Sequence, residues 1–382
     1  MSKIINIGVV GCGYWGPNLI RNFHSLSRCK MKYMCDANPL RLKHLKTLYP
    51  DVEGLLDYDE MLKASNLDAV IVATSVKRHY SMAKASLLAG KHTFIEKPMA
   101  TSVAECQELV EIAESKGLIL MVGHTFLYSP AVRRMKELLA RTHDMGAIQY
   151  ICSRRLNLGL FQKDINVTWD LAPHDISIIL YLLDESPVSI NCRGNAHVTP
   201  GVEDVTSLSM TFRRGTFAMV HNSWLDPRKV REMTIVCAKR MIVYDDIEPL
   251  EKIKIYDTRV ETPPHYDTFA EFQCSYHYGD IYTPYLKQEE PLKVECQHFL
   301  DCIIQNETPL SCGRQGMELV RVLEAASLSL KRHGAVVDLR PEHHNSEAGA
   351  NGNGNGNGNG HPASGTGHGH TPAKPSSETV PA

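Results

Sequence analysis

The chain lacks the features that would place it among membrane, secreted or zinc-binding proteins. No uninterrupted apolar run approaches the roughly 20 residues that a membrane-spanning helix needs. An apolar strand pattern begins at Ile4, which leaves no room for a signal peptide before it. The 11 cysteines include no Cys-x-x-Cys pair and their number is odd, which favours reduced thiols over a disulfide framework or a zinc site. We therefore predict a cytoplasmic protein without a metal site.

The chain also lacks an excess of charge of either sign. It has 41 Lys and Arg against 43 Asp and Glu, so its net charge of −2 gives no general attraction for nucleic acid or an anionic membrane. Its hydrophobic content of 43% is ordinary for a globular protein. Because 382 residues are long for one domain, we expect two folded domains and a small-molecule partner.

A glycine-rich turn follows the first predicted strand, residues 4–10. Its sequence, Gly11-Cys12-Gly13-Tyr14-Trp15-Gly16, has the G-x-G-x-x-G spacing of a turn that holds a dinucleotide. Gly11 permits the tight turn, Gly13 lets the backbone approach a pyrophosphate, and Gly16 lets helix and strand pack closely. A glycine turn can also serve packing alone, but the strand before it and the helix after it favour the dinucleotide.

An acidic residue follows the next predicted strand, residues 31–35. Asp36 lies twenty residues past Gly16, where a carboxylate accepts hydrogen bonds from the adenosine ribose. Its charge repels the 2′-phosphate of NADP, so we expect NAD as the cofactor, with NADP as the weaker alternative. Arg41 nearby softens that preference.

Strand and helix signals then alternate as far as Gly123. Strands are predicted at residues 68–74, 92–96 and 118–122, and helices at residues 79–88 and 102–116. Ser102 and Glu105 form a capping box at the start of the second of these helices. This alternation predicts an α/β domain with a doubly wound parallel sheet.

The next region reads differently, because long and partly alternating apolar runs replace the strand–helix alternation. These runs cover residues 147–156, 188–196, 205–212, 216–223 and 233–244. Helices are predicted at residues 129–139, 174–183, 296–305 and 316–333, whereas residues 257–291 show no assignable pattern. The pattern indicates an α+β domain with a large, mostly antiparallel sheet and helices on one face.

These observations divide the chain into three parts. We expect a dinucleotide-binding domain at residues 1–124 and a substrate-binding and oligomerisation domain at residues 125–341. Residues 342–382 contain an Asn-Gly repeat and a Gly/His/Pro/Ser mixture, which cannot bury enough apolar area to form a core. We predict a disordered low-complexity tail there.

Lys97 is the first candidate for chemistry. It follows the predicted strand 92–96 and so lies at the carboxyl end of the sheet, where open α/β sheets bind their ligands. A lysine that is partly desolvated there can lose or share a proton at moderate pH. The alternative is a surface lysine paired with Glu96.

The segment Trp169–Asp175 is the second candidate. Pro173 is tolerated in the first turn of a helix, which predicts that a helix begins within this segment. Asp170 and His174 are four residues apart, so they face one side of that helix. A histidine suits proton removal from a hydroxyl, and the carboxylate can orient it. Equally, Asp170 can cap the helix while His174 is a hydrogen-bonded core residue, and spacing alone leaves both readings open.

Polar and basic residues precede this segment: Arg154, Arg155, Asn157, Gln162, Lys163 and Asn166. Such a strand end can hold an anionic or hydroxyl-rich substrate. An exposed rim with ordinary charges is the alternative, which the composition slightly favours.

Taken in order, these motifs resemble the glucose–fructose oxidoreductase/inositol dehydrogenase (Gfo/Idh/MocA) family over residues 3–338. The matching features are the glycine turn, the run from Ala89 to Pro98, and the Asp-x-x-x-His spacing in the second domain. The resemblance implies an N-terminal Rossmann domain and a C-terminal domain whose open sheet often mediates dimers or tetramers. Residues 155–159 and 166–175 look most like the branch that acts on nucleotide-linked sugars, which includes 3-dehydrogenases of UDP-N-acetylglucosaminuronic acid.

By this resemblance Lys97 matches the family's catalytic lysine, His174 its catalytic histidine, and Asp170 the acid four residues earlier. The remaining predicted cofactor contacts are Tyr14, Trp15, Thr74, His79, Glu96 and Lys97 itself. The predicted substrate contacts are Tyr128, Arg155, Asn157, Asn166, Asp170 and His174.

We therefore predict hydride transfer between NAD and a secondary hydroxyl or ketone of a sugar, at C3 of a nucleotide-linked sugar by the resemblance. The first alternative is a dehydrogenase of a free polyol such as inositol. The second is a regulator that binds NAD without turnover, against which the joint presence of Lys97, Asp170 and His174 argues.

Overall fold

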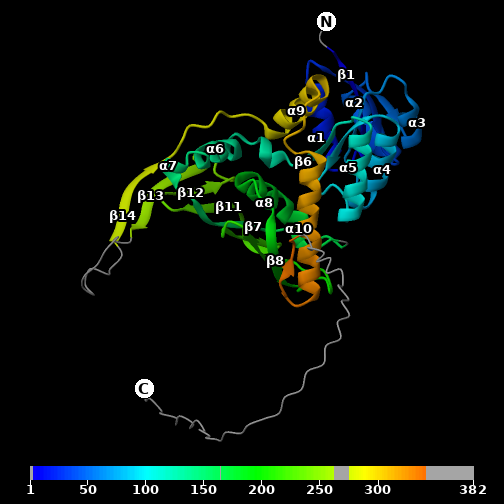
Figure 1. Cartoon of the computed structure of the whole chain (residues 1–382). Helices are drawn as coiled ribbons and strands as arrows, with labels where there is room; N and C mark the ends of the chain where they lie inside the picture. The colour runs from blue at the N-terminus through cyan, green and yellow to red at the C-terminus, as the bar shows by residue number, and fades with distance from the viewer. Residues whose placement is uncertain (1–2, 164, 262–274, 341–382) are drawn as a thin grey trace, which may run out of the picture. The chain divides into compact units, whose positions relative to one another are not determined.

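The first sheet of the protein is parallel and six-stranded, with the order β3-β2-β1-β4-β5-β6. The computed structural model describes residues 3–163, 165–261 and 275–340, so the predicted tail at 342–382 lies outside the described residues. The strands are β1 (Ile5–Val10), β2 (Cys29–Cys35), β3 (Glu53–Leu55), β4 (Ala69–Val72), β5 (His92–Glu96) and β6 (Leu120–Gly123). The intervening helices are α1 (Gly16–His24), α2 (Pro39–Leu48), α3 (Tyr58–Lys63), α4 (Val76–Leu88) and α5 (Val103–Ser115) (Figure 1).

The strand order reverses direction at β1, which lies between β2 and β4. This is the doubly wound arrangement, and the crevice beyond the carboxyl ends of β1 and β4 is its switch point. Helices cover both faces, so the strands carry continuous apolar runs; all four residues of β4 are buried. The predicted fold class of the N-terminal half is confirmed.

Three elements of this half had no counterpart in the sequence prediction, namely α2, β3 and α3. Helix α2 buries only Leu42 and Leu45, so its apolar stripe is too narrow to stand out in the sequence. It begins because the Asn38 side chain accepts a hydrogen bond from the Leu40 amide at 2.9 Å.

The predicted capping box of α5 forms only in part. Ser102 Oγ accepts the Glu105 amide at 3.2 Å, as a capping box requires. The Glu105 carboxylate, however, accepts the amide of Thr101 at 2.9 Å instead of the amide of Ser102.

The second sheet has nine strands in the order β14-β13-β12-β11-β7-β10-β9-β8-β15. The strands are β7 (Ile148–Leu158), β8 (Pro187–Asn195), β9 (Val205–Phe212), β10 (Phe217–Ser223), β11 (Leu225–Cys237), β12 (Met241–Asp245), β13 (Ile253–Glu261), β14 (Ser275–Tyr282) and β15 (Val337–Asp338). The β7–β10 pair is parallel, and the other pairs of this sheet are antiparallel. The predicted large, mostly antiparallel sheet is thus confirmed.

Two details of this sheet differ from the prediction. The run at residues 233–244 is not one strand but the end of β11 and the start of β12, joined by a turn in which the Cys237 amide bonds the Arg240 carbonyl at 3.0 Å. Strand β13 extends into residues 257–291 and β14 lies within them, where we predicted no element. The residues of β14 are largely exposed and those of β13 beyond Ile255 are half-buried or exposed, so no buried face produces a clear alternation there.

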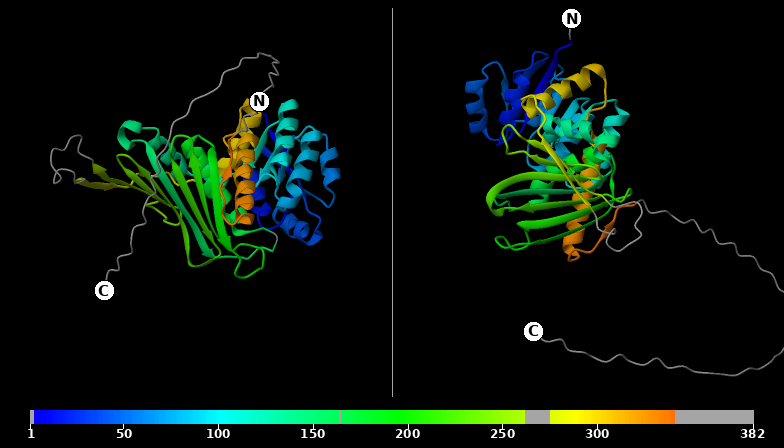
Figure 2. Two further views of the ribbon diagram at one scale, coloured as in Figure 1. Left: turned by 60° about the horizontal axis from the view of Figure 1, so that its bottom comes forward. Right: turned by 90° about the vertical axis from the view of Figure 1, so that its left-hand side faces the viewer.

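The helices of the second half are the short 3-10 helix η1 (Thr125–Tyr128), α6 (Pro130–Leu139), α7 (Thr142–Met145), α8 (Val167–Leu183), α9 (Pro291–Gln305) and α10 (Gly313–Lys331). Helix α8 packs on β7, β9 and β10, and α10 on β8. Helices α9 and α10 also return to the first half, where they contact α1 and α5 (Figures 1 and 2). Among the described residues, no helix is both long enough and apolar enough to cross a membrane.

The start of α8 corrects a prediction. The helix begins at Val167, before the segment in which we expected it, because Asn166 Oδ1 accepts the Trp169 amide at 3.2 Å. Pro173 consequently lies inside the helix, where it removes the hydrogen bond to the carbonyl of residue 169. The backbone of α8 is therefore incompletely bonded in its first two turns, close to Asp170.

Candidate active site

The glycine turn between β1 and α1 has the shape that a dinucleotide needs. Gly11 has a φ of +94°, and a Cβ there would lie 2.5 Å from the Ala73 carbonyl oxygen. A Cβ at Gly16 would lie 2.0 Å from the Gly11 carbonyl oxygen, so α1 sits directly on the turn. A Cβ at Gly13 would meet only Arg41, at 3.7 Å, which leaves open space beside the backbone. The turn therefore fits a pyrophosphate.

Asp36 closes the same turn from the end of β2. Its Oδ2 accepts the Cys12 amide at 2.7 Å, and its Oδ1 accepts the Asn38 amide at 2.8 Å. Arg41, half exposed, lies 3.4 Å from Oδ2. The carboxylate is fixed by backbone donors and keeps lone pairs for ribose hydroxyls.

Thr74 and His79 were also predicted to contact the cofactor. Thr74 follows β4 and its side chain is partly exposed at the crevice. His79 is buried, with one ring nitrogen 2.8 Å from the Pro98 carbonyl oxygen and the other 3.0 Å from that of Thr74. The structure therefore corrects the assignment of His79, which ties the ends of β4 and β5 together and does not face the crevice.

Glu96 ends β5, and its carboxyl group lies against Gly123 of β6. A Cβ at Gly123 would come within 3.1 Å of Glu96 Oε1, an atom that is buried and has no partner among the described residues. Burial raises the pKa of Glu96 to about 7, opposed by the charge of Lys97 and by the Trp15 side chain. Tyr14 beside Trp15 is 93% exposed, so both aromatic residues of the glycine turn lie at the rim of the crevice.

A second buried carboxyl group lies near Glu96. Glu295 of α9 is fully buried, and its Oε2 accepts the Thr125 hydroxyl at 2.7 Å. Burial, and to a lesser extent the charge of Glu96, raises the pKa of Glu295 well above its usual value. Burial therefore favours the neutral form of this carboxyl group.

Lys97 follows β5 of the first sheet and reaches α8, which packs on the second sheet. Its Nζ donates to the Asp170 carbonyl oxygen at 3.0 Å and lies 4.0 Å from the Asp170 carboxylate. Burial lowers the pKa of Lys97, while the carboxylates of Asp170 and Glu96 raise it. The indole of Trp224 donates to Asp170 Oδ2 at 3.1 Å.

His174 lies one helical turn beyond Asp170, and its ring packs against Phe126 of η1 with 5.0 Å between ring centroids. Burial lowers the pKa of His174 well below its usual value, and the charges of Lys97 and Arg155 lower it further. His174 Nδ1 is buried without a partner among the described residues. The structure thus corrects the expectation that Asp170 orients His174, because Lys97 and Trp224 hold its carboxylate.

Arg155 does not clasp a substrate as its sequence neighbourhood suggested. It is buried and forms a bidentate pair with Asp175, with nitrogen–oxygen distances of 2.7 and 3.2 Å. Its guanidinium also lies 4.7 Å from the centre of the Phe126 ring. Arg155 therefore supports the Phe126–His174 contact and adds positive charge beside it.

Two asparagine side chains of the large sheet point toward α8 on the same face as Arg155. Asn157 follows Arg155 by two residues on β7, and Asn222 of β10 is the register partner of Arg155. Asn222 is fully buried, yet neither polar atom of its amide has a partner among the described residues; the same holds for Asn157 Oδ1. Buried amides normally have partners, so these atoms are available to a ligand.

The two remaining predicted substrate contacts have structural partners of their own. Tyr128 is buried in the core, and its hydroxyl bonds the hydroxyl of Ser311 at 2.8 Å. Asn166 caps α8 and donates to the Glu203 carboxylate at 2.8 Å. Both side chains therefore also have structural roles, and their predicted contacts with the substrate stay predictions.

Sequence reasoning missed Phe126, Trp224, Asn222, Asp175 and His124. Except for Asp175, each belongs to a segment far in the chain from Asp170 and His174. A buried tryptophan or asparagine at a strand end carries no motif, so only Asp175, directly after His174, was within reach of pattern reading. Within residues 3–163, 165–261 and 275–340, no group of three or more His, Cys, Asp or Glu side chains is placed to hold a metal ion.

Comparison with known proteins agrees with this geometry. Residues 5–124 match the model of the GFO_IDH_MocA oxidoreductase family with its NAD-binding Rossmann fold, and residues 134–243 match the GFO/IDH/MocA C-terminal domain. The chain belongs to this family. It is an NAD-dependent oxidoreductase that acts on CH–OH groups, and the predicted family, enzyme class and cofactor are confirmed.

Among individual relatives, UDP-N-acetylglucosamine 3-dehydrogenase of Acidithiobacillus ferrooxidans is 26% identical over 84% of this chain and 94% of that protein. Its solved structure superposes with a TM-score of 0.71 over 86% of this chain and 98% of the other. Inositol 2-dehydrogenase of Burkholderia multivorans is 27% identical over 48% of this chain and 56% of that protein. The structure of GenD2 from gentamicin A biosynthesis, in complex with NAD, has a TM-score of 0.75 at 18% identity over 89% of this chain and 98% of that chain.

Proposed function

We propose that this protein interconverts a secondary hydroxyl and a ketone of a nucleotide-linked sugar, at C3 as the family resemblance implies. NAD, when bound, supplies the hydride acceptor. The observation that carries the proposal is the hydrogen bond from Lys97 to the Asp170 carbonyl oxygen of α8. One helical turn further along α8 lies His174, which is buried and neutral. An amine and an imidazole so placed bind a hydroxyl oxygen and take its proton.

The role proposed for Lys97 is to hold the reacting oxygen. Burial lowers the pKa of Lys97, while the charges of Asp170 and Glu96 raise it and so favour the charged amine. A charged ammonium in a partly buried site stabilises the negative charge that develops on the oxygen as its proton leaves. Asp170, anchored by Trp224, sets the position of this amine, which replaces the histidine-orienting role first expected of it.

The role proposed for His174 is that of the general base. Because its pKa is depressed, the ring is neutral at physiological pH and can accept a proton. Phe126 packs against the His174 ring, and Arg155 packs against Phe126. This packing holds the imidazole in place, so no carboxylate is needed to orient it.

The unpartnered amides favour a hydroxyl-rich substrate. Asn222 and Asn157 hold buried polar atoms that have no partner among the described residues, and they lie on the sheet face that packs against α8, the helix of Asp170 and His174. Sugar hydroxyls both donate and accept, so they match an amide's oxygen and nitrogen. The full-length similarity to UDP-N-acetylglucosamine 3-dehydrogenase, against half-length similarity to inositol 2-dehydrogenase, favours a nucleotide-linked sugar over a free polyol.

A substrate screen tests the proposal. Purified protein is incubated with NAD and either UDP-sugars, dTDP-sugars or free polyols, and the absorbance of reduced cofactor is followed. We expect turnover with a nucleotide sugar and competitive inhibition by the free nucleotide. Turnover with inositol but not with nucleotide sugars would establish the polyol alternative, and cofactor binding without turnover on any of them would establish the regulator.

We also propose a homo-oligomer, a dimer or tetramer, formed through the open face of the large sheet. Exposed apolar side chains lie along this face: Tyr150, Phe217, Val260, Tyr276, Tyr278 and Ile281. In the described part of the chain, the helices gather on the other face (Figure 2). Light scattering is expected to give the mass of a dimer or tetramer, and Phe217→Lys to lower it; a monomeric native protein would contradict the proposal.

The ten described cysteines are free thiols. This agrees with the cytoplasmic location that we propose, which cell fractionation would check.

A further inference from the structure

The 3-10 helix η1 carries the ring that packs against His174. It follows β6 of the first sheet and lies against α8 and α9. Phe126 of η1 meets the His174 ring edge to face, with 5.0 Å between the ring centroids. A single turn of four residues has few backbone hydrogen bonds of its own. The contacts of η1 with neighbouring elements therefore decide where Phe126 lies.

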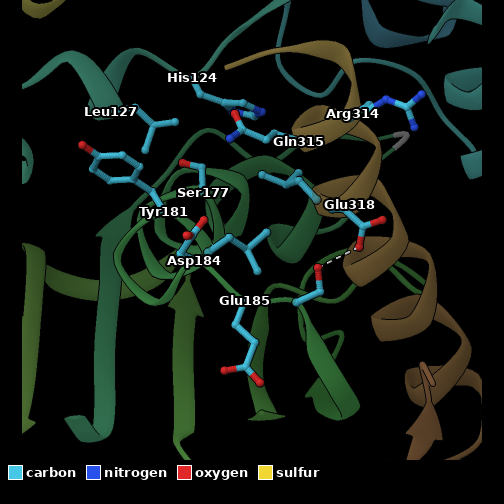
Figure 3. Close-up of a pocket in the computed structure, with 12 residues that line it drawn as sticks. His124, Leu127, Ser177, Tyr181, Asp184, Glu185, Arg314, Gln315 and Glu318 are labelled. Atoms are coloured by element: carbon cyan, nitrogen blue, oxygen red, sulfur yellow. Dashed lines mark hydrogen bonds between the residues drawn. The ribbon is translucent and has the colours of Figure 1, made fainter. Parts of the chain in front are cut away.

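Close packing does not hold η1 on the side of Leu127. This residue lines a cavity of about 270 Å³ between η1, α8 and α10. Figure 3 shows Leu127 and Tyr181 on one side of the cavity and Arg314 of α10 on the other. Protein interiors fix an element by close contact over its surface, and a space of this size removes that support on one side. The position of η1 thus depends on specific contacts elsewhere on its surface.

Two side chains of η1 form hydrogen bonds with other segments. The Thr125 hydroxyl donates to Glu295 Oε2 of α9 at 2.7 Å. The hydroxyl groups of Tyr128 and Ser311 lie 2.8 Å apart. Thr125 directly precedes Phe126, whereas Tyr128 follows it by two residues. The bond between Thr125 and Glu295 is therefore the one nearer in the chain to the Phe126 ring.

Glu295 is a firm anchor for this hydrogen bond. It is fully buried in α9, which packs on α1, and Asn22 of α1 donates to the carboxylate of Glu290 at the start of α9 at 3.1 Å. The second oxygen of Glu295, Oε1, is buried without a partner among the described residues. Because a buried polar atom without a partner lowers stability, an apolar side chain would serve packing better at this position. The presence of a glutamate therefore points to a role beyond packing.

We propose that Glu295 is a positioning residue for the general base His174. Its hydrogen bond with Thr125 holds η1 in place, and Phe126 of η1 in turn holds the imidazole ring. This inference rests on the proposed function, which gives His174 the role of base. Arg155 supports the same ring from the large sheet, with its guanidinium 4.7 Å from the centre of the Phe126 ring. Without the bond to Glu295, η1 is free to move toward the cavity, and the imidazole loses its neighbour.

The first test observes the His174 ring itself and needs neither cofactor nor substrate, so its failure is distinct from failure of the proposed function. NMR of full-length protein labelled with ¹³C-histidine gives the chemical shifts of the His174 ring protons, which His174→Asn assigns. Phe126→Leu gives their values without the neighbouring ring. Thr125→Val, which removes the hydroxyl group, should move the shifts toward those values, and Thr125→Ser, which keeps it, should not. Native shifts in Thr125→Val, or equal changes in both variants, would overturn the proposal.

The second test changes the other end of the bond. Glu295→Leu should move the His174 shifts as Thr125→Val does, whereas Glu295→Gln, which keeps an oxygen to accept the Thr125 hydroxyl, should leave them native. The double variant of Thr125→Val and Glu295→Leu should change them no further, because all three proteins lack the same bond. Additive changes would show that the two residues act separately and would contradict the proposal. If Glu295→Leu does not fold, Thr125→Val decides alone.

The third test is turnover with NAD and a nucleotide sugar that the native enzyme oxidises. Thr125→Val should lower kcat about tenfold with little change in the KM for NAD, because a misplaced base takes the proton less readily. Ser86→Ala is the matched control, since it removes another buried hydroxyl, which lies 2.8 Å from that of Thr93, and its kcat should stay native. Native kcat in Thr125→Val, or an equal fall in Ser86→Ala, would reject the positioning role.

Discussion

The two sides of the candidate active site are built in different ways. On the cofactor side, two backbone amides hold the Asp36 carboxylate, and the ring nitrogens of His79 lie 2.8 and 3.0 Å from carbonyl oxygens, one of which accepts the single N–H of the neutral ring. On the substrate side, Asn222 and His174 keep buried polar atoms without partners among the described residues. The hydrogen bonds of a site for a common cofactor can be formed within the protein before the cofactor binds. The substrate side instead leaves polar atoms free to hydrogen-bond a ligand, and such bonds give specificity for that ligand.

The largest expected effect comes from removing the group that bridges the two sides. Lys97→Met should lower kcat/KM about 10²- to 10⁴-fold, because the amine that holds the substrate oxygen is lost. The dissociation constant of NAD, measured by calorimetry, should change little. Lys43→Met on the exposed side of α2 is the matched control and should behave as the native enzyme. Unchanged turnover in Lys97→Met would remove Lys97 from the mechanism.

A second variant tests whether activity depends on the packing around Trp224, a residue outside the proposed reacting groups. A Cβ at Gly159 would lie 2.6 Å from Trp224 Cδ1, and Trp224 anchors Asp170. Gly159→Ala should therefore displace the indole, lower kcat/KM about tenfold and destabilise the fold by about 1–3 kcal/mol.

The control for this variant separates activity from stability. Gly215 has a φ of +85° and open space around its Cα, so Gly215→Ala should cost stability through backbone strain alone, about 1 kcal/mol. Its kcat/KM should stay native. Equal loss of activity in both variants would mean that general destabilisation, and not the Trp224–Asp170 contact, explains the result.

The comparison also shows which parts of the molecule the sequence could predict. The glycine turn, Asp36 and Lys97 were found because each follows a strand in a fixed local pattern, and a parallel sheet brings strand ends together. Trp224, Asn222 and Phe126 were not found, because their place in the site arises from the register of the large sheet and the packing of η1 on α8. The role of Asp170 was misjudged for the same reason: its spacing to His174 is local, but its partners Lys97 and Trp224 are 73 and 54 residues away.

A third variant tests whether the unpartnered polar atoms on the substrate side bind the substrate. Asn222→Leu replaces a fully buried amide without partners by an apolar side chain of similar size, which should raise the free energy of unfolding by about 1–3 kcal/mol. If the amide binds a sugar hydroxyl, kcat/KM should fall about 10- to 100-fold in the same protein. Denaturant unfolding and kinetics measure the two effects; the exposed Asn195→Leu is the control. A more stable variant with native kinetics would show that Asn222 is not part of the substrate site.

The last prediction concerns Glu96, whose Oε1 is buried near the cofactor side without a partner among the described residues. Its pKa is raised from 4.5 to about 7, so the native state keeps a proton that the unfolded chain releases. Stability should therefore be highest below pH 4.5 for this group and fall as the pH rises to 7, by up to about 3 kcal/mol for a shift of this size. Glu96→Gln, which stays neutral, should abolish this loss, as thermal unfolding of the protein without NAD between pH 4.5 and 7.5 would show. Identical pH profiles for the native protein and the variant would mean that the pKa of Glu96 is the same in the native and the unfolded protein.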